Sequence, residues 1–193
     1  WHLVSTWYHE GVPGHHLQFG YTVLLKEQLS RYQRTLGWIS GYGEGWALYS
    51  ERLMDELGYF TDPGNELGFL SAQALRAARI IVDTGMHLGL EVPAGIPGEV
   101  AGTPINYDFS VDFLQRRALL PAVEAESETV RYLGMPAQAI SYKLGERTIL
   151  AVREAARARA GSNFSLKDWH SWFLGLGPVG LSTLLELAAA ETG

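Results

Sequence analysis

Three histidines and a glutamate lie close together near the start of the chain, in the segment His9-Glu10-Gly11-Val12-Pro13-Gly14-His15-His16. In many zinc hydrolases two histidines four residues apart on a helix bind one ion, and the glutamate beside the first is the general base. That glutamate takes a proton from the attacking water. We therefore interpret the segment as a candidate zinc site, with Glu10 as the base. A purely structural role for the cluster is the alternative.

The spacing of the histidines departs from that pattern, because His15 and His16 follow His9 by six and seven residues. On a regular helix His15 would lie roughly 120° around the axis from His9, and His16 about 10.5 Å along it. Pro13 removes a helical hydrogen bond and clashes with the preceding turn, while Gly14 can adopt almost any conformation. We predict a break that lets one of the later histidines reach the same ion. His15 is favoured, and His16 stays open as the ligand.

A zinc site of this type needs a third protein ligand and an open position for water. Glu44 is the candidate, since it begins a predicted helix that can pack beside the histidine segment. Glu51 lies seven residues later on the same helix face and is expected to orient a histidine ligand by a hydrogen bond. The alternative for Glu44 is a charge at a helix start, favoured by the helix dipole.

The elements that must position these side chains are helices, and the fold class predicted from the sequence is all-α. Residues 37–45 contain four glycines and predict a loop or short extended edge. Residues 90–108 contain three prolines and predict a long ordered loop. Apolar periodicity and capping residues predict helices over residues 15–34, 44–57, 65–88, 110–119, 121–133, 136–159, 166–174 and 181–191.

The 193 residues, 47% of them hydrophobic, suffice for one domain over 1–193. A net charge of -6 without any basic cluster argues against a nucleic-acid partner. The absence of cysteine excludes disulfides and thiolate chemistry. No apolar run is long enough for a transmembrane segment. The start at Trp1 suggests a C-terminal piece of a longer protein, so the cytoplasm and the bacterial cell envelope are both open as locations.

Four motifs, YHEGVPGHHLQ, GEGWALYSERLMDELG, IIVDTGMH and AISYKLGERTIL, occur in this order across residues 8 to 150. In them the chain resembles the bacterial family called domain of unknown function 885. That family is similar, more distantly, to the helical zinc peptidases that include angiotensin-converting enzyme and thimet oligopeptidase.

The resemblance implies a helical zincin-like metallopeptidase catalytic region that lacks several hundred preceding residues of its own chain. It also implies that a histidine or tyrosine from a distant helix donates a hydrogen bond to the tetrahedral intermediate. His87 and Tyr142 match the family motifs and are the candidates for this catalytic role. Such a donor contributes a few kcal/mol in a dry site.

We therefore expect a zinc-dependent hydrolase, with a peptide or another small molecule as substrate. An esterase-like metal hydrolase and a catalytically silent binding domain of the same fold are the alternatives. Trp46 is expected to line the site, while His170 and His2 are expected to be structural. The oligomeric state stays open. A substrate carboxylate could bind to one of three basic residues, Arg79, Lys143 and Arg147.

Overall fold

A computed structural model describes residues 3–191. Within them the protein is all-helical, as the sequence predicts, and the only β-pairing is an isolated bridge between Glu91 and Pro104. None of these helices combines the length and the apolar character that crossing a membrane requires. His2 lies outside the described residues. The helices are α1 (Leu3–Glu10), α2 (His15–Leu24), α3 (Arg31–Thr35), α4 (Ser40–Glu56), α5 (Pro63–Leu88), α6 (Tyr107–Ala118), α7 (Ala122–Gly134), α8 (Ser141–Ala160), a 3-10 turn (Gly161–Asn163), α9 (Leu166–Gly175) and α10 (Leu181–Ala190).

The predicted break in the histidine segment is confirmed. Helix α1 ends at Glu10 and α2 begins at His15, with a cis peptide bond before Pro13 between them. Gly14 is required here, because a Cβ on it would lie 1.8 Å from the carbonyl oxygen of His9. The indole Nε1 of Trp46 donates to the carbonyl oxygen of Pro13 at 2.8 Å, which fixes the turn against α4.

The prediction of one helix over residues 15–34 is wrong. Helix α2 ends at Leu24, and a new helix starts after Ser30. The Ser30 side chain accepts a hydrogen bond from the Gln33 backbone, and the Gln33 side chain accepts one from the Ser30 backbone. This capping box favours a fresh helix start over continuation of the preceding one.

Two other boundaries also differ from the predictions. Helix α4 begins at Ser40, so the second half of the predicted glycine loop is helical. Helix α8 begins at Ser141, five residues after the predicted start at Pro136, because Ala137 adopts a left-handed conformation with φ of 67°. A left-handed residue cannot continue a right-handed helix.

Close packing against α8 explains why the start of α4 is helical where its glycines predicted a loop. Gly45 lies against α8, where a Cβ on it would come within 2.6 Å of the Gly145 Cα. A Cβ on Gly145 would in turn lie 2.0 Å from the Gly41 carbonyl oxygen. The three glycines therefore let the backbones of α4 and α8 approach more closely than any side chain would allow.

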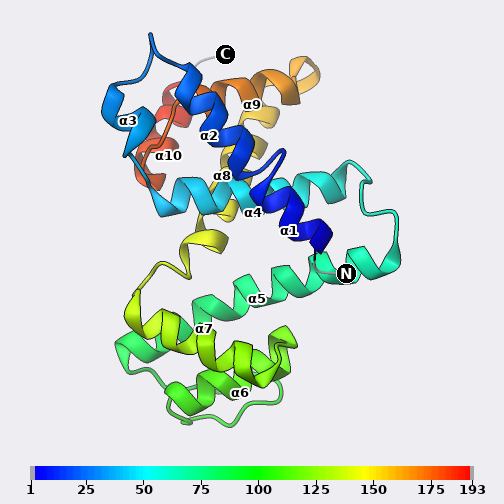
Figure 1. Ribbon diagram of the computed structural model, residues 1–193, viewed down its shortest axis with the longest axis vertical. Helices are drawn as coiled ribbons and strands as arrows, with labels where there is room; N and C mark the ends of the chain where they lie inside the picture. Colours follow the sequence, from blue (N-terminus) through cyan, green and yellow to red (C-terminus); the bar gives the residue numbers. More distant parts are fainter. Residues whose placement is uncertain (1–2, 192–193) are drawn as a thin grey trace.

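The helices form two packed groups (Figure 1). Helix α4 runs across the middle of the view, with α2, α3, α9 and α10 above it and α5, α6 and α7 below it. Helix α1 contacts both α4 and α5. The upper group has an aromatic-rich core of Tyr42, Trp46, Tyr49, Leu53, Ile149, Val152, Trp169, Phe173, Leu174 and Leu184. The lower group has its own core of Ala78, Val82, Val92, Ile105, Phe109, Phe113, Leu114, Ala125 and Tyr132.

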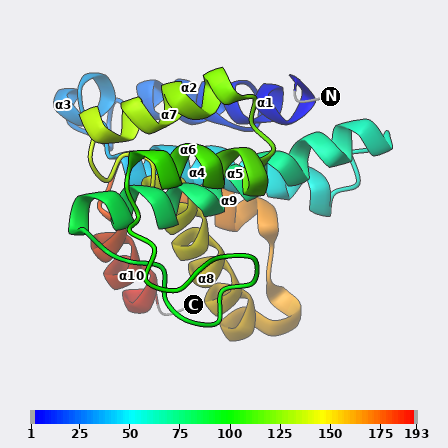
Figure 2. The same ribbon diagram turned by 90° about the horizontal axis from the view of Figure 1, so that it is seen from below.

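The proline-rich segment between α5 and α6 is a long loop, as predicted, and is drawn in green in Figure 2. Gly89 ends α5 in a left-handed conformation with φ of 60°. Glu99 then ties the loop to α6, since its carboxylate pairs with Arg116 at 2.9 Å and with Arg117 at 2.8 Å.

Replacing Gly45 by alanine is expected to destabilise the protein. The added methyl group would force α4 and α8 apart, and we expect a loss of at least about 2 kcal/mol in the free energy of unfolding, measured with urea. Gly20→Ala in α2 is the matched control, because a Cβ there meets nothing within 4 Å. It should add about 0.5–1 kcal/mol of stability. A neutral Gly45→Ala would contradict the close crossing.

Stability is expected to fall as the pH drops below neutrality, because of His170. Its Nε2 lies 2.7 Å from the Tyr49 hydroxyl. Burial, reinforced by the charge of Arg153, lowers the pKa of His170 from 6.5 to about 4. The unfolded chain therefore binds a proton that the folded protein does not, and stability present above pH 6.5 is lost towards pH 4.

Partial exposure screens this effect, so we expect a loss of about 1 kcal/mol between about pH 7 and about pH 5. Urea unfolding at both pH values measures it. His170→Gln should show a flatter dependence, and an unchanged slope in that variant would rule out His170 as the titrating group.

Candidate metal centre

Two imidazoles and a carboxylate converge where α1, α2 and α4 meet. The Nε2 atom of His15 lies 3.3 Å from Oε2 of Glu44, and the Nε2 atom of His9 lies 3.6 Å from the same oxygen. The two rings are nearly perpendicular, with centroids 4.9 Å apart. All three side chains are buried. Both imidazoles therefore direct a ring nitrogen at the same carboxylate oxygen.

The donor set fits a zinc ion. Oε2 of Glu44 is buried and has no hydrogen-bond partner, although two ring nitrogens face it. Ligands at about 2.0–2.1 Å from a tetrahedral zinc ion lie roughly 3.3–3.4 Å from one another, close to the 3.3 and 3.6 Å that separate the two nitrogens from Oε2 of Glu44. A buried carboxylate oxygen without a partner is costly unless a cation or donor completes it.

Glu10 lies beside this group. Ligand-type atoms of His9, Glu10 and His15 all lie within 4.8 Å of one another. Glu10 is the last residue of α1 and is exposed, whereas both histidines are buried. Its carboxylate can therefore exchange protons with water at the edge of the centre.

The far side of the His9 ring is fixed by Glu51. Oε1 of Glu51 lies 2.8 Å from Nδ1 of His9, and the Ser5 hydroxyl donates to Oε2 of the same carboxylate. Arg76 of α5 approaches Oε1 at 3.6 Å. Glu51 thus contacts the His9 ring on the side away from Glu44, and it links α1, α4 and α5.

The electrostatics favour positive charge at the centre. Burial would lower the pKa of His9, but the neighbouring carboxylates of Glu44 and Glu51 outweigh it and raise that pKa. Burial would raise the pKa of Glu44, yet the contacts with His15 and His9 bring it down to about 2. The pKa of Glu51 is lowered against its burial by Arg76 and His9. Both carboxylates are therefore anionic at neutral pH.

Tyr142 of α8 covers the same histidine. Its ring stacks on the His9 ring with centroids 5.9 Å apart and an interplanar angle of 19°. The guanidinium of Arg79 lies 4.9 Å from the centroid of the Tyr142 ring. The structure thus brings Tyr142, one of the two predicted hydrogen-bond donors, next to the candidate ligands.

Two predicted site residues lie elsewhere. The His16 side chain is exposed, while its neighbour His15 is buried in the centre. Among the described contacts, Nδ1 of His87 bonds to Asp83, at 2.9 Å from Oδ1. His87 also lies eight residues beyond Arg79, about 12 Å further along α5. The geometry therefore leaves Tyr142 as the candidate donor.

The predicted carboxylate-binding residues differ in their surroundings. Arg79 is buried and pairs with Glu128 at 2.7 Å, and Lys143 pairs with Glu146. Arg147 is exposed. Trp46, expected to line the site, is buried in the core and supports the Pro13 turn.

The comparisons with known proteins identify the family. Residues 1–187 match the family described as bacterial protein of unknown function, DUF885. The chain belongs to this family. No curated protein matches it.

Two solved structures resemble this DUF885 member. The putative lipoprotein from Colwellia psychrerythraea is 33% identical, with a TM-score of 0.82 over 96% of this chain and 29% of that one. A putative lipoprotein of unknown function from Shewanella oneidensis is 27% identical, with a TM-score of 0.79 over 97% of this chain and 31% of that one. The chain therefore spans less than a third of either structure.

Three residues of this DUF885 member form hydrogen bonds or ion pairs with the candidate ligands or with Glu51 and were not predicted from the sequence. Ser5 stands four residues before His9 and so shares its helix face, a spacing that could have indicated it. Arg76 reaches Glu51 from α5. The Gln138 amide donates to Oε1 of Glu44 at 3.3 Å from the turn before α8. No local pattern marks Arg76 or Gln138, because both depend on tertiary packing.

Replacing Glu51 by alanine should strongly destabilise this DUF885 protein. The change leaves His9, Ser5 and Arg76 without their shared partner, and removing one member of a buried charged group costs about 3–5 kcal/mol. Urea unfolding measures the loss. Glu154→Gln, on the exposed face of α8, should change stability by less than about 0.5 kcal/mol. Equal effects of the two substitutions would show that the Glu51 network is not stabilising.

Proposed function

We propose that this protein is a zinc-dependent hydrolase that cleaves peptide bonds. One observation carries the proposal: Oε2 of Glu44 is buried, unpartnered and 3.3–3.6 Å from Nε2 of His15 and of His9. Three protein ligands with an exposed glutamate at the edge are typical of a catalytic zinc site, whereas structural sites close with four ligands.

Each residue of the centre has a distinct part in the proposal. Zinc, when bound by His9, His15 and Glu44, would supply Lewis-acid polarisation of the substrate carbonyl. Glu10 accepts a proton from the attacking water and passes it to the leaving amine. The Tyr142 hydroxyl donates a hydrogen bond to the oxygen that gains negative charge. Glu51 holds the His9 ring so that Nε2 faces inward.

The choice of a peptide substrate rests on the family's similarity to helical zinc peptidases, and the location rests on the solved relatives. Both of those proteins are named as putative lipoproteins, and on that basis we propose the cell envelope as the location of this protein. Because the chain covers only 29% and 31% of them, activity is best measured on the full-length protein.

The protein is expected to bind about one zinc ion per chain, measured by metal analysis after dialysis. His15→Ala and Glu44→Ala should each weaken zinc affinity by at least about a hundredfold, since each removes one of three ligands. His16→Ala is the matched control and should bind zinc like the wild type. Equal losses for His15→Ala and His16→Ala would contradict the ligand assignment.

Glu10→Gln should keep the zinc and lose activity. A general base contributes about 10²–10⁴ in rate, so cleavage of a defined peptide mixture, followed by mass spectrometry, should fall by at least about a hundredfold. Glu66→Gln, far along the chain at the start of α5, should retain activity. A fully active Glu10→Gln protein would remove Glu10 from the mechanism, and a zinc-loaded wild type without any hydrolysis would favour a silent binding domain.

A further inference from the structure

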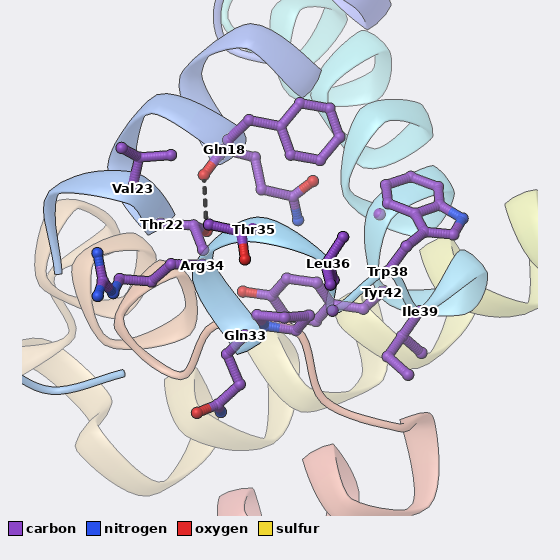
Figure 3. A pocket seen from close by; sticks show the side chains of 14 residues that line it. Gln18, Thr22, Val23, Gln33, Arg34, Thr35, Leu36, Trp38, Ile39 and Tyr42 are labelled. Atoms are coloured by element: carbon purple, nitrogen blue, oxygen red, sulfur yellow. Dashed lines mark hydrogen bonds between the residues drawn. The ribbon is translucent and has the colours of Figure 1, made fainter. Parts of the chain in front are cut away.

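A pocket of about 290 Å³ lies beside the candidate metal centre, between α2 and the segment that joins α3 to α4 (Figure 3). Two aromatic side chains of its lining also contact a candidate ligand. The Phe19 ring stacks on the His15 ring with centroids 5.5 Å apart, and the Trp38 ring lies 5.9 Å from it. The pocket and the candidate metal centre therefore share a wall.

The wall is built with a glycine on α4. A Cβ on Gly43 would lie 2.2 Å from the Trp38 ring, so the indole rests directly on the backbone next to Glu44. Phe19 and Trp38 also contact each other, with ring centroids 5.6 Å apart. A substrate side chain bound in the pocket would therefore lie next to the candidate metal ligands His15 and Glu44.

The pocket lining includes a buried amide whose hydrogen bonds are incomplete. Gln18 is only 2% exposed, and neither its amide nitrogen nor its amide oxygen has a hydrogen-bond partner. Figure 3 shows this side chain extending from α2 into the space lined by Trp38 and Tyr42. The Tyr42 hydroxyl donates to the Phe173 carbonyl oxygen at 2.9 Å, so towards Gln18 it can only accept from the amide nitrogen. The amide oxygen of Gln18 is left without a donor.

An unsatisfied buried amide costs about 1–3 kcal/mol, and a bound group that both donates and accepts would recover this. The pocket volume is near the lower limit for ligand sites, which suits one large side chain. The rings of Phe19, Trp38 and Tyr42 favour an aromatic occupant. A phenol combines an aromatic ring with a hydroxyl that can both donate and accept a hydrogen bond.

We propose that this pocket is a specificity site for a tyrosine residue of the substrate, whose hydroxyl pairs with the Gln18 amide. The proposal deepens the proposed function and rests on it for the reaction, but binding in the pocket does not require the metal. A site built to pair a hydroxyl discriminates strongly against the analogue that lacks it, because its polar group then stays unpaired.

The test compares N-acetyl-L-tyrosinamide, N-acetyl-L-phenylalaninamide and N-acetyl-L-glutaminamide as probes, titrated into the full-length protein and followed by NMR. The tyrosine and phenylalanine probes differ only in the hydroxyl. We expect the tyrosine probe to bind about tenfold more tightly than the phenylalanine probe, with and without zinc. Equal binding of these two probes, or tighter binding of the glutamine probe, would overturn the proposal.

Gln18→Leu locates the discriminating group. In this variant the tyrosine and phenylalanine probes should bind with about equal affinity, and the phenylalanine probe should bind as it does to the wild type. The thermal stability should be unchanged or higher, because the substitution removes unpaired polar atoms. A tyrosine preference that persists in Gln18→Leu would assign the discrimination elsewhere. Val23→Trp, at a half-exposed lining position, should fill the pocket and abolish binding of both probes; retained binding would place the probes outside it.

The two proposals fail separately. If the protein binds no zinc but prefers the tyrosine probe, the specificity-site proposal stands and the hydrolase proposal fails. If the protein binds zinc and cleaves peptides with no preference for tyrosine, the hydrolase proposal stands and the specificity-site proposal fails.

Discussion

One imidazole held between two carboxylates of the same helix organises this protein. Glu44 and Glu51 stand seven residues apart on α4, about 10.5 Å along its axis. His9 spans part of that distance, with Nδ1 on Glu51 and Nε2 towards Glu44. Helix α1 can therefore dock on α4 in only one register, and Glu10 follows at its end.

The same helix sets the positions of the remaining parts. Gly41 and Gly45, in the first two turns of α4, bring α8 close enough for Tyr142 to stack on His9. Gly43 leaves room for the Trp38 ring to pack beside His15. A single helix, with glycines in its first two turns and two buried carboxylates, thus joins the candidate metal centre, the stacked tyrosine and the neighbouring pocket. The two hydrophobic cores support this helix and α5 from either side.

Local chemistry in the sequence predicts much of this arrangement. Pro13 and Gly14 predict the break between α1 and α2, and the heptad spacing of Glu44 and Glu51 predicts a shared helix face. The sequence alone cannot choose between His15 and His16, because the choice depends on how α2 leaves the turn. It also predicts a loop where Gly41 and Gly45 are helical, since glycine lowers helix propensity and only the contact with α8 offsets that cost. Arg76, Gln138 and Gln18 act through tertiary neighbours, so no local pattern indicates them.

The imidazoles of His9 and His15 differ in the contacts that hold their rings. Nδ1 of His9 faces the Glu51 carboxylate, which keeps a hydrogen on Nδ1 and directs Nε2 inward, towards Glu44. Nδ1 of His15 is buried without a partner, and that ring is restrained by stacking on Phe19 and by the contact of its Nε2 with Glu44. Both nitrogens of the His9 ring therefore face a carboxylate, whereas the His15 ring has a polar contact at Nε2 and an unpaired Nδ1. The fold therefore orients His9, on α1, more firmly than His15, on α2.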